Sequence, residues 1–390
     1  MTTTESLEGS VSVRLSVAGG RVRAADVQVR RPNAARALVG RKPDEAVRLV
    51  PLLFSLCGTA QTLAAAEALE EALGIDAAPH ATARALLVLA ETVESHAWQA
   101  LIEWPRRLGE EPQPRTLAAL RAATASVPKA LYPARDGLRP GGGVLRPDRD
   151  ALERAAVRVR EQVERIVFGG PVPTGVAALS DWAAEGATPA ARLMRRALEP
   201  GLAGFGACGV AALAPHPARW FGERLAAAPG FSETPDQDGA PAHTGPLARH
   251  AAHPLVAALL TGHGSGLAAH VGARLVELAD LPARMERLVA TLAPAEPVGG
   301  SGGPGLGSGA VDTARGRLAH WVRLEEGRIA DCRIVAPTEW NFAADGPLAR
   351  GLTGAAADDG LWQRAGLLVT ALDPCVACTI AIEQEDPAHA

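Results

Sequence analysis

The chain has 390 residues, enough for one large domain or two modest ones, and its formal net charge of −4 gives no basic footprint for a nucleic-acid partner. Hydrophobic residues make up 47% of the sequence but aromatic residues only 4%, which favours helices packed through small side chains. The first ten residues lack a basic segment followed by an apolar stretch, and no window approaches the roughly 20 apolar residues of a membrane helix, so we expect a cytoplasmic protein without a secretory signal or membrane insertion.

The N-terminal part of the sequence predicts a β-hairpin followed by helices. Residues 11–17 and 22–29 alternate apolar and polar side chains, which is typical of two paired strands. Over residues 44–73 the apolar residues recur at helical spacing, and Gly74 is a suitable residue to end that helix. A further amphipathic helix is expected over 80–104, where a proline follows.

The remaining chain predicts mainly helices and one more hairpin. Residues 115–295 alternate helical patterns with breaks rich in proline and glycine, and the Gly/Ser-rich segment 299–309 is expected to be a flexible connector. A second hairpin is expected over 317–324 and 328–335, and a short helix over 360–372. No internal repeat divides the chain, so we expect a single domain of all 390 residues, of α+β class but predominantly α.

Five cysteines, an odd number, argue against a disulfide framework and leave metal ligands, nucleophiles or core filler. Cys375 and Cys378 form a CxxC, whose spacing lets two thiolates converge on one soft or borderline metal ion. A redox dithiol, or no function, remains an alternative, although no βαβ pattern surrounds the pair. Taken alone, Cys57 in a helical pattern and Cys332 on an apolar strand face are expected to be core thiols, and a structural role is favoured for Cys208.

Five histidines between residues 243 and 270 invite comparison with a metal-binding tract. They are His243, His250, His253, His263 and His270. Their spacings fit no single helical face, so we expect them to be surface residues rather than ligands of one ion.

Several short segments carry more information by their order than any one of them does alone. They are 7–9 (LEG), 38–43 (LVGRKP), 245–249 (GPLAR), 315–321 (RGRLAHW), 337–341 (PTEWN) and 373–378 (DPCVAC). With these segments the chain resembles the large subunits of nickel–iron hydrogenases along most of its length. In that family an N-terminal CxxC and a C-terminal DPCxxCxxH supply four thiolates, which hold nickel and an iron carrying cyanide and carbonyl ligands. The resemblance implies a hydrogenase-large-subunit-like helical core, with small antiparallel sheets near the N- and C-terminal parts.

The departures from the family pattern concern its metal sites. Where the first motif should end in a second cysteine, the chain has Ala60, and in the family's enzymes that missing thiolate bridges nickel and iron. Where the last motif should end in histidine, the chain has Ala381; in the enzymes this histidine belongs to a second metal site and precedes the maturation cut. The segment before Gly40 also lacks the glutamate of that second site. These departures imply that the chain is not a processed hydrogenase and not an enzyme, and that its site does not take nickel.

This pattern is similar to that of the HupK/HoxV-type hydrogenase accessory proteins within the same superfamily. The resemblance implies a scaffold that transiently holds the iron–dicyano–carbonyl unit before its transfer to the hydrogenase large subunit. By that resemblance Cys57, Cys375 and Cys378 are the metal ligands. Hydrogenase maturation factors and the hydrogenase large subunit are the implied partners.

Three further residues are expected at the iron unit. Arg315 and Thr338 match residues that donate hydrogen bonds to the cyanide ligands, and a guanidinium suits the negative charge on cyanide nitrogen. Asp373 is expected to orient the CxxC or to accept a hydrogen bond from Arg315. The alternatives are a surface cation at a strand end for Arg315, a turn residue for Thr338 and a helix or turn cap for Asp373.

Two other functions remain open from the sequence. The chain can be a metal-free mimic of the large subunit that binds maturation factors. It can also be an atypical hydrogenase-like enzyme in which His96 or Glu94 replaces the missing ligand, although a helical histidine is more often a partly buried polar group.

Overall fold

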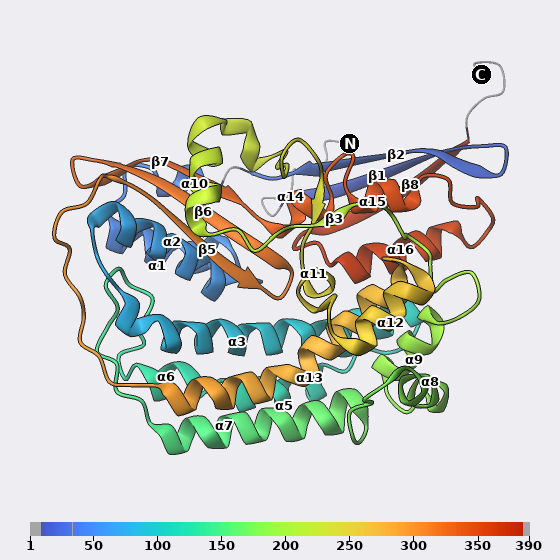
Figure 1. The fold of residues 1–390 in the computed structure, drawn as a ribbon, viewed down its shortest axis with the longest axis horizontal. Coiled ribbons are helices and arrows are strands. Elements are labelled where there is room, and N and C mark those ends of the chain that lie inside the picture. Colours follow the sequence, from blue (N-terminus) through green and yellow to red (C-terminus); the bar gives the residue numbers. More distant parts are fainter. Residues whose placement is uncertain (1–8, 33, 385–390) are drawn as a thin grey trace.

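The computed structural model describes residues 9–32 and 34–384. In Figure 1 the strands of the two three-stranded sheets lie along one side of the molecule, and the long helices α3 (Ala81–Trp98), α7 (Arg149–Gln162) and α13 (Leu267–Thr291) lie along the other. The expected fold class, a mainly helical α+β protein, is confirmed. Leu7 and Glu8 of the first family-like segment lie outside the described residues.

The elements follow one another without a repeated unit. The strands are β1 (Ser10–Ala18), β2 (Arg21–Arg30), β3 (Ala211–Ala212), β4 (Ala242–His243), β5 (Leu306–Thr313), β6 (Gly316–Glu325), β7 (Arg328–Val335) and β8 (Ala377–Gln384). The other α-helices are α1 (Pro43–Leu53), α2 (Gly58–Leu73), α4 (Trp104–Leu108), α5 (Pro114–Thr124), α6 (Val127–Leu131), α8 (Val176–Glu185), α9 (Pro189–Ala197), α10 (Ala218–Ala227), α11 (Pro246–His250), α12 (Pro254–His263), α14 (Pro337–Asn341), α15 (Pro347–Leu352) and α16 (Leu361–Leu372). The 3-10 segments are η1 (Ala34–Leu38), η2 (Ala78–His80) and η5 (Pro229–Ser232), and the π-helical segments are η3 (Gln99–Glu103) and η4 (Val163–Phe168).

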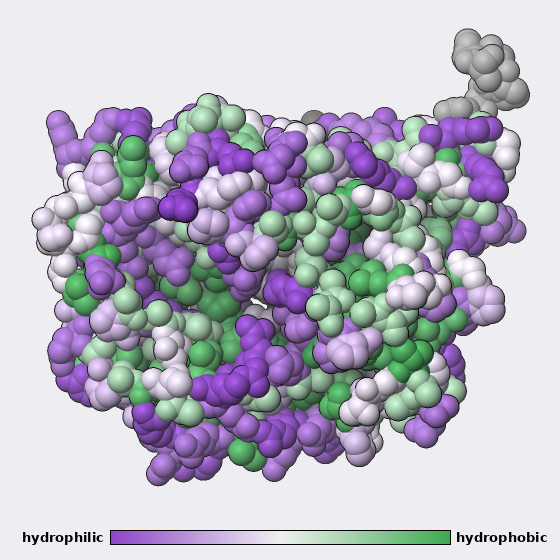
Figure 2. Space-filling view, in the orientation of Figure 1, coloured by the Kyte–Doolittle hydropathy of each residue, from purple (hydrophilic) through white to green (hydrophobic). Residues whose placement is uncertain are grey.

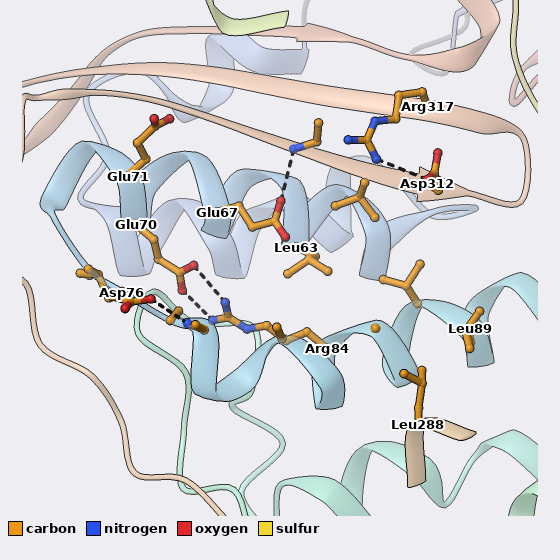
Figure 3. A pocket seen from close by; sticks show the side chains of 18 of the residues that line it. Leu63, Glu67, Glu70, Glu71, Asp76, Arg84, Leu89, Leu288, Asp312 and Arg317 are labelled. Atoms are coloured by element: carbon orange, nitrogen blue, oxygen red, sulfur yellow. Dashed lines mark hydrogen bonds and ion pairs between the residues drawn. The ribbon is translucent and has the colours of Figure 1, made fainter. Parts of the chain in front are cut away.

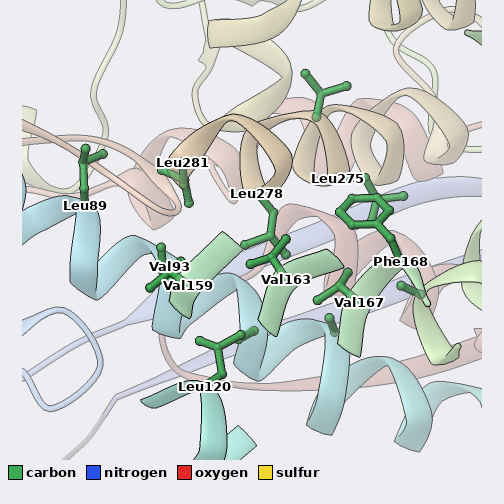
Figure 4. Close-up of a cluster of buried hydrophobic side chains, with 14 of the residues drawn as sticks. Leu89, Val93, Leu120, Val159, Val163, Val167, Phe168, Leu275, Leu278 and Leu281 are labelled. Atoms are coloured by element: carbon green, nitrogen blue, oxygen red, sulfur yellow. The ribbon is translucent and has the colours of Figure 1, made fainter. Parts of the chain in front are cut away.

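The largest hydrophobic core lies between the long helices and is built from leucine, valine and alanine. Val93 of α3, Val159 of α7 and Leu281 of α13 are all fully buried there (Figure 4). Burying one such side chain contributes about 1.5–3 kcal/mol to stability. Small residues between these side chains let the helices approach closely, as the low aromatic content predicts.

The first hairpin is confirmed, but its sheet also contains the end of the chain. Strands β1 and β2 are antiparallel, and β8 pairs with the other edge of β1 in parallel, with Val11 opposite Cys378. The prediction of purely antiparallel sheets is therefore wrong at this point. A parallel pair cannot be joined by a tight turn, so its two strands need not be neighbours in sequence and local patterns cannot reveal the pairing. The pairing brings the CxxC strand onto the N-terminal hairpin.

The second hairpin, β6–β7, is confirmed, and the structure adds β5 as a third antiparallel strand. Residues 306–309 of the expected connector belong to β5. The earlier part of that segment is tied to the end of α2, since Ser301 N donates to Gly74 O at 3.2 Å. Gly74 ends α2 with a left-handed φ of 67°, as expected from its sequence.

Two predicted helices have different limits in the structure. The pattern over 44–73 forms two helices, α1 and α2, and Cys57 occupies the N-cap position of the second rather than the middle of one helix. Gly58 allows the start of α2 to lie close to Pro51 of α1, because an added Cβ would lie 3.2 Å from the Pro51 side chain. The pattern over 80–104 continues through the π-helical η3 into α4, because Pro105 stands in the first turn of α4, where a backbone N–H is dispensable.

Within the described ranges, no helix combines the length and the apolar character that crossing a bilayer requires.

The packing of β5 on α2 generates a first prediction. A methyl group on Gly309 would overlap the carbonyl oxygen of Ala64 in α2, whereas one on Gly299 would meet no atom within 4 Å. We expect Gly309→Ala to lower the free energy of unfolding by about 1–3 kcal/mol, the usual cost of overpacking. Gly299→Ala, the matched control, should stay within about 0.5 kcal/mol of the unmodified protein in urea denaturation. Equal stabilities of the two variants would contradict this packing.

Candidate metal-binding site

Cys57 stands at the start of α2, where the break between α1 and α2 leaves it half-buried. Removal of its sulfur from water, followed by the negative charges of Cys375 and Glu91, raises the pKa of Cys57 to about 12. The side chain of Gln61, one turn along α2, donates a hydrogen bond to the thiol. Cys57 therefore stands at the N-cap position of α2, near the charges of Cys375 and Glu91, rather than in the core.

Cys375 lies within hydrogen-bonding distance of two side chains. The Nη2 of Arg31 is 2.5 Å from its sulfur, and the Oγ1 of Thr338 is 3.3 Å from the same atom. The backbone N–H of Cys375 also donates to Thr338 Oγ1, at 3.4 Å. Thr338, in the first turn of α14, thus contacts Cys375, whereas its expected role as a donor to cyanide stays a prediction. Arg31 was not singled out from the sequence, because nothing around it distinguishes it from the other arginines that flank β2.

Arg315 is buried, at 7% exposure, in the turn between β5 and β6. Its Nη1 donates to Ser95 Oγ at 3.1 Å, and its Nη2 lies 3.3 Å from an oxygen of Asp373. Its Nε is buried and has no hydrogen-bond partner among the described residues. The alternative of a surface cation at a strand end is therefore wrong. A buried guanidinium with one unused N–H can donate to an anionic ligand.

Asp373 ends α16 with a left-handed φ of 56° and is buried. Its carboxylate lies 2.7 Å from Nη1 of Arg274 and 2.5 Å from Nε2 of Gln99, in addition to Arg315. Burial alone would raise the pKa of Asp373, but the charges of Arg315 and Arg274 hold it below its usual value. The residue is thus both a helix end and an ion-pair partner of Arg315. It fixes the backbone two residues before Cys375.

Cys378 lies in β8 and is half-buried. Burial raises the pKa of its thiol to about 11, and the charge that acts against this is that of Arg107. Its sulfur lies 3.9 Å from the carbonyl oxygen of Thr379. Over residues 9–32 and 34–384, no three His, Cys, Asp or Glu side chains are arranged around one point as a metal would require. Cys57 thus lies within electrostatic reach of Cys375, and the described residues show no contact of Cys378 with either thiol. The ligand roles of all three stay predictions.

Glu91 of α3 belongs to the site although the sequence did not point to it. Its carboxylate accepts the backbone N–H groups of Thr59, at 2.6 Å, and of Ala60, at 3.1 Å. These are free N–H groups in the first turn of α2, so Glu91 caps that helix from a neighbouring one. Burial raises the pKa of Glu91, against these hydrogen bonds. The one feature of the sequence that could have pointed to Glu91 is its position, as an acidic residue, on the apolar face of a predicted helix.

Neither residue considered as a replacement ligand lies beside the thiols. His96 is fully buried and its Nε2 is 2.9 Å from Glu277, which also binds Arg249. Glu94 binds Thr124 at 2.5 Å. Both side chains are thus held by other partners in the helical part of the molecule.

The remaining cysteines and histidines differ in their surroundings. Cys332 is buried, as expected for a core thiol, and burial raises its pKa to about 12. Cys208 contacts Ser265 through its backbone. The surface assignment is wrong for His243, which is buried with a pKa lowered to about 4 by burial and whose ring faces that of His270. β4 and α13 enclose this pair, which local sequence spacing could not show.

A cavity of about 950 Å³ opens between α2, α3, α13 and β5. It corresponds to the hollow in the face shown in Figure 2, and Figure 3 shows Glu67, Arg84 and Arg317 at its wall. Burial raises the pKa of Glu67 to about 7, against a hydrogen bond from the backbone N–H of Ala310. The described residues that line it include none of the five cysteines, so the cavity and the thiol site are different places.

Comparison with known proteins gives two kinds of similarity by sequence. Residues 247–381 match the family described as nickel-dependent hydrogenase. Over nearly the whole chain, the sequence is 30% identical to the hydrogenase expression/formation protein HupK of Azotobacter vinelandii, covering 96% of this chain and 99% of that protein. It is 31% identical to the corresponding protein HoxV of Cupriavidus necator, covering 92% of this chain and 94% of that protein.

Similarity to a hydrogenase large subunit is more local in sequence but extensive in structure. The uptake hydrogenase large subunit of Rhizobium leguminosarum is 34% identical over 87 residues, which is 20% of this chain. The nickel–iron–selenium hydrogenase of D. vulgaris Hildenborough superposes with a TM-score of 0.67 at 19% identity, covering 93% of this chain and 95% of that one. The expected large-subunit-like fold is thereby confirmed.

The cap that Glu91 provides generates a second prediction. Glu91→Ala leaves the N–H groups of Thr59 and Ala60 without their acceptor, and we expect it to lower the free energy of unfolding by about 1–3 kcal/mol. Glu94→Ala on the same helix is the matched control. Its carboxylate is 37% exposed, so the loss should be below about 1 kcal/mol. Urea denaturation followed by circular dichroism measures both, and a control as damaging as Glu91→Ala would refute the capping role.

A third prediction concerns pH. His320 of β6 is fully buried with Nε2 2.6 Å from Gln61 Oε1, and burial lowers its pKa to about 3. Above pH 6.5 both folded and unfolded states hold it neutral; below that, only the unfolded state gains a proton. Its contribution to stability is therefore complete above pH 6.5 and lost as pH falls, by about 1.4 kcal/mol per pH unit, or about 2 kcal/mol by pH 5. His320→Gln should reduce the difference between unfolding free energies at pH 7 and pH 5 by that amount. An unchanged difference would show that His320 does not carry it.

Proposed function

The chain belongs to the family of hydrogenase expression/formation proteins that includes HupK and HoxV, and we propose that it acts in hydrogenase maturation by holding an iron–dicyano–carbonyl unit for transfer to the hydrogenase large subunit. The iron unit is its cargo rather than a resident cofactor. The chain itself does not turn over hydrogen.

One observation carries this proposal: two thiols from distant parts of the chain lie near the buried guanidinium of Arg315 and the partly buried guanidinium of Arg31. Cys57 comes from the start of α2 and Cys375 from the turn before β8. Arg31 contacts Cys375 directly, and Arg315 keeps a buried N–H without a protein partner. Thiolates suit iron, and guanidinium donors suit the nitrogen of an iron-bound cyanide.

Each residue of the site has a part in holding the cargo. Cys57 and Cys375, with Cys378 as the third expected ligand, bind the iron. Arg315 donates to one cyanide through its free Nε, and Thr338 holds Cys375 and adds a hydroxyl donor. With the pKa of Cys57 near 12, the free thiol is protonated, so iron uptake releases protons and weakens as pH falls.

The altered positions support a carrier rather than a hydrogenase. Ala60 offers no donor atom, so the place of the fourth thiolate of the enzymes is filled by a methyl group, and its N–H is bound by Glu91. A site with fewer thiolates can release its iron unit more readily than the four-thiolate site that receives it. The absence of a bridging thiolate also disfavours nickel. Partners of such a carrier are the maturation factors that supply the iron unit and the large subunit that accepts it.

This function can be tested on protein purified after co-expression with the hydrogenase maturation machinery. We expect bound iron and infrared bands of metal-bound cyanide and carbonyl, and no nickel. Cys57→Ala, Cys375→Ala and Cys378→Ala should each abolish these bands, because each removes one expected ligand. Cys208→Ala is the matched control and should keep the bands. Cys208 is also half-buried, and only its backbone, not its thiol, bonds to Ser265.

The same experiment separates the proposal from its main alternative. If the unmodified protein carries neither iron nor the infrared bands, and the triple Cys57/Cys375/Cys378→Ala variant still supports full hydrogenase maturation, the chain is a metal-free mimic of the large subunit. Stoichiometric nickel with hydrogen turnover would instead identify an atypical enzyme.

A further inference from the structure

Arg31 reaches the thiol site from the end of the N-terminal hairpin. Its Nη2 lies 2.5 Å from Cys375 Sγ, and its Nε lies 2.9 Å from Glu339 Oε1. The ion pair with Glu339, a residue of α14, fixes the plane of the guanidinium. Although it lies beside this carboxylate, the Nε is buried and makes no hydrogen bond to any described residue.

Arg31 contacts Cys375 directly, and Arg315 pairs with Asp373, two residues before Cys375. After burial, which lowers the pKa of Arg31, nearby negative charges raise it, and those of Cys375 and Cys57 are among them. The same two thiols act in the same direction on the pKa of Arg315. The two guanidiniums come from opposite ends of the chain, one after β2 and the other between β5 and β6. The site therefore has two cations around one pair of thiols.

Each of these guanidiniums has a buried Nε that makes no hydrogen bond to any described residue: that of Arg31, beside the Glu339 carboxylate, and that of Arg315. Buried N–H donors are rarely left without an acceptor, so a ligand bound at the thiol site is expected to accept from these two groups. Their number suggests two acceptors on the ligand rather than one. Planar guanidinium groups are well suited to anionic acceptors, because they are always charged and weakly hydrated.

The charge of the cargo leads to the same conclusion. A ferrous ion with two cyanides and a carbonyl is neutral, and each thiolate that binds it adds one negative charge. With the thiolates of Cys57 and Cys375 the assembly carries two negative charges, and with Cys378 three, in a half-buried place, which is costly without cations nearby. Arg315 shares its counter-ion, Asp373, with Arg274, so it is only partly neutralised by the protein.

We propose that Arg31 is a second anion-recognising residue of the site, which donates to one cyanide of the iron unit while Arg315 donates to the other. This inference rests on the proposed function and adds to it a residue that selects for two anionic ligands on the iron. Thr338 then serves chiefly to hold Cys375, to which its hydroxyl already lies 3.3 Å.

The test compares Arg31→Gln with Arg30→Gln in protein co-expressed with the maturation machinery. Arg30 is the adjacent, exposed residue of β2 and changes the net charge equally. We expect Arg31→Gln to lose its iron to a chelator about tenfold faster, the usual effect of one lost hydrogen bond to a charged group, and to shift one of the cyanide stretching bands. Arg30→Gln should match the unmodified protein in both measurements.

If circular dichroism shows that the Arg31→Gln variant does not fold, the Arg31→Lys variant is tested instead. Lysine keeps the charge and the pair with Glu339 but has no fork to reach a cyanide at the same time, so one cyanide band should still shift. Cyanide bands and iron loss identical to those of the unmodified protein, in whichever variant folds, overturn the role of Arg31 and leave the proposed function standing. If Arg30→Gln loses iron as fast as Arg31→Gln, the role of Arg31 is also overturned, because the effect then follows from the change in net charge. Absence of cyanide bands from the unmodified protein overturns the proposed function together with this inference.

Discussion

The buried carboxylate of Asp373 holds the parts of the site in place. It pairs with Arg274 of α13 and Arg315 of the β5–β6 turn, and it accepts a hydrogen bond from Gln99 after α3. A carboxylate at this depth is tolerated only with such partners, because an isolated buried charge costs several kcal/mol. The helical core and the second sheet are thereby fastened to one residue. That residue directly precedes Pro374 and Cys375, so the ion pairs also place the thiol.

The second constraint is the sheet that joins the two ends of the chain. Because β8 runs parallel to β1, the start of β8 and the end of β2 lie close to the same rim of this sheet. Cys375 arrives from one and Arg31 from the other, and the two side chains meet at 2.5 Å. Cys57 is supplied by the start of α2 and Glu91 by α3. The site is therefore a junction of segments and has no counterpart in any single stretch of sequence.

The composition of this junction fits a carrier better than a catalyst. Two guanidinium groups accompany two thiols, and Ala60 stands where the enzymes have the cysteine of the fourth thiolate. Glu91 caps α2 by accepting the backbone N–H groups of Thr59 and Ala60, so the helix that presents Cys57 is held without a metal bridge. A preformed site of this kind can receive an anionic iron unit without refolding, which is useful when the unit must later leave.

Much of this protein was determined by local sequence. The alternation in 11–29, the helical spacing on either side of Gly74 and the hairpin over 317–335 all predicted elements correctly, because each depends on neighbours a few residues away. The ordered motifs also brought Thr338, Arg315 and Asp373 to attention. The structure places Thr338 against Cys375 and pairs Arg315 with Asp373, two residues before that thiol. Only the tertiary structure decided the parallel β1–β8 pair, the N-cap position of Cys57 and the burial of His243. It also decided the recruitment of Arg31 and Glu91. These features depend on contacts between residues far apart in sequence, whose side chains carry no local sign of the partner they will meet.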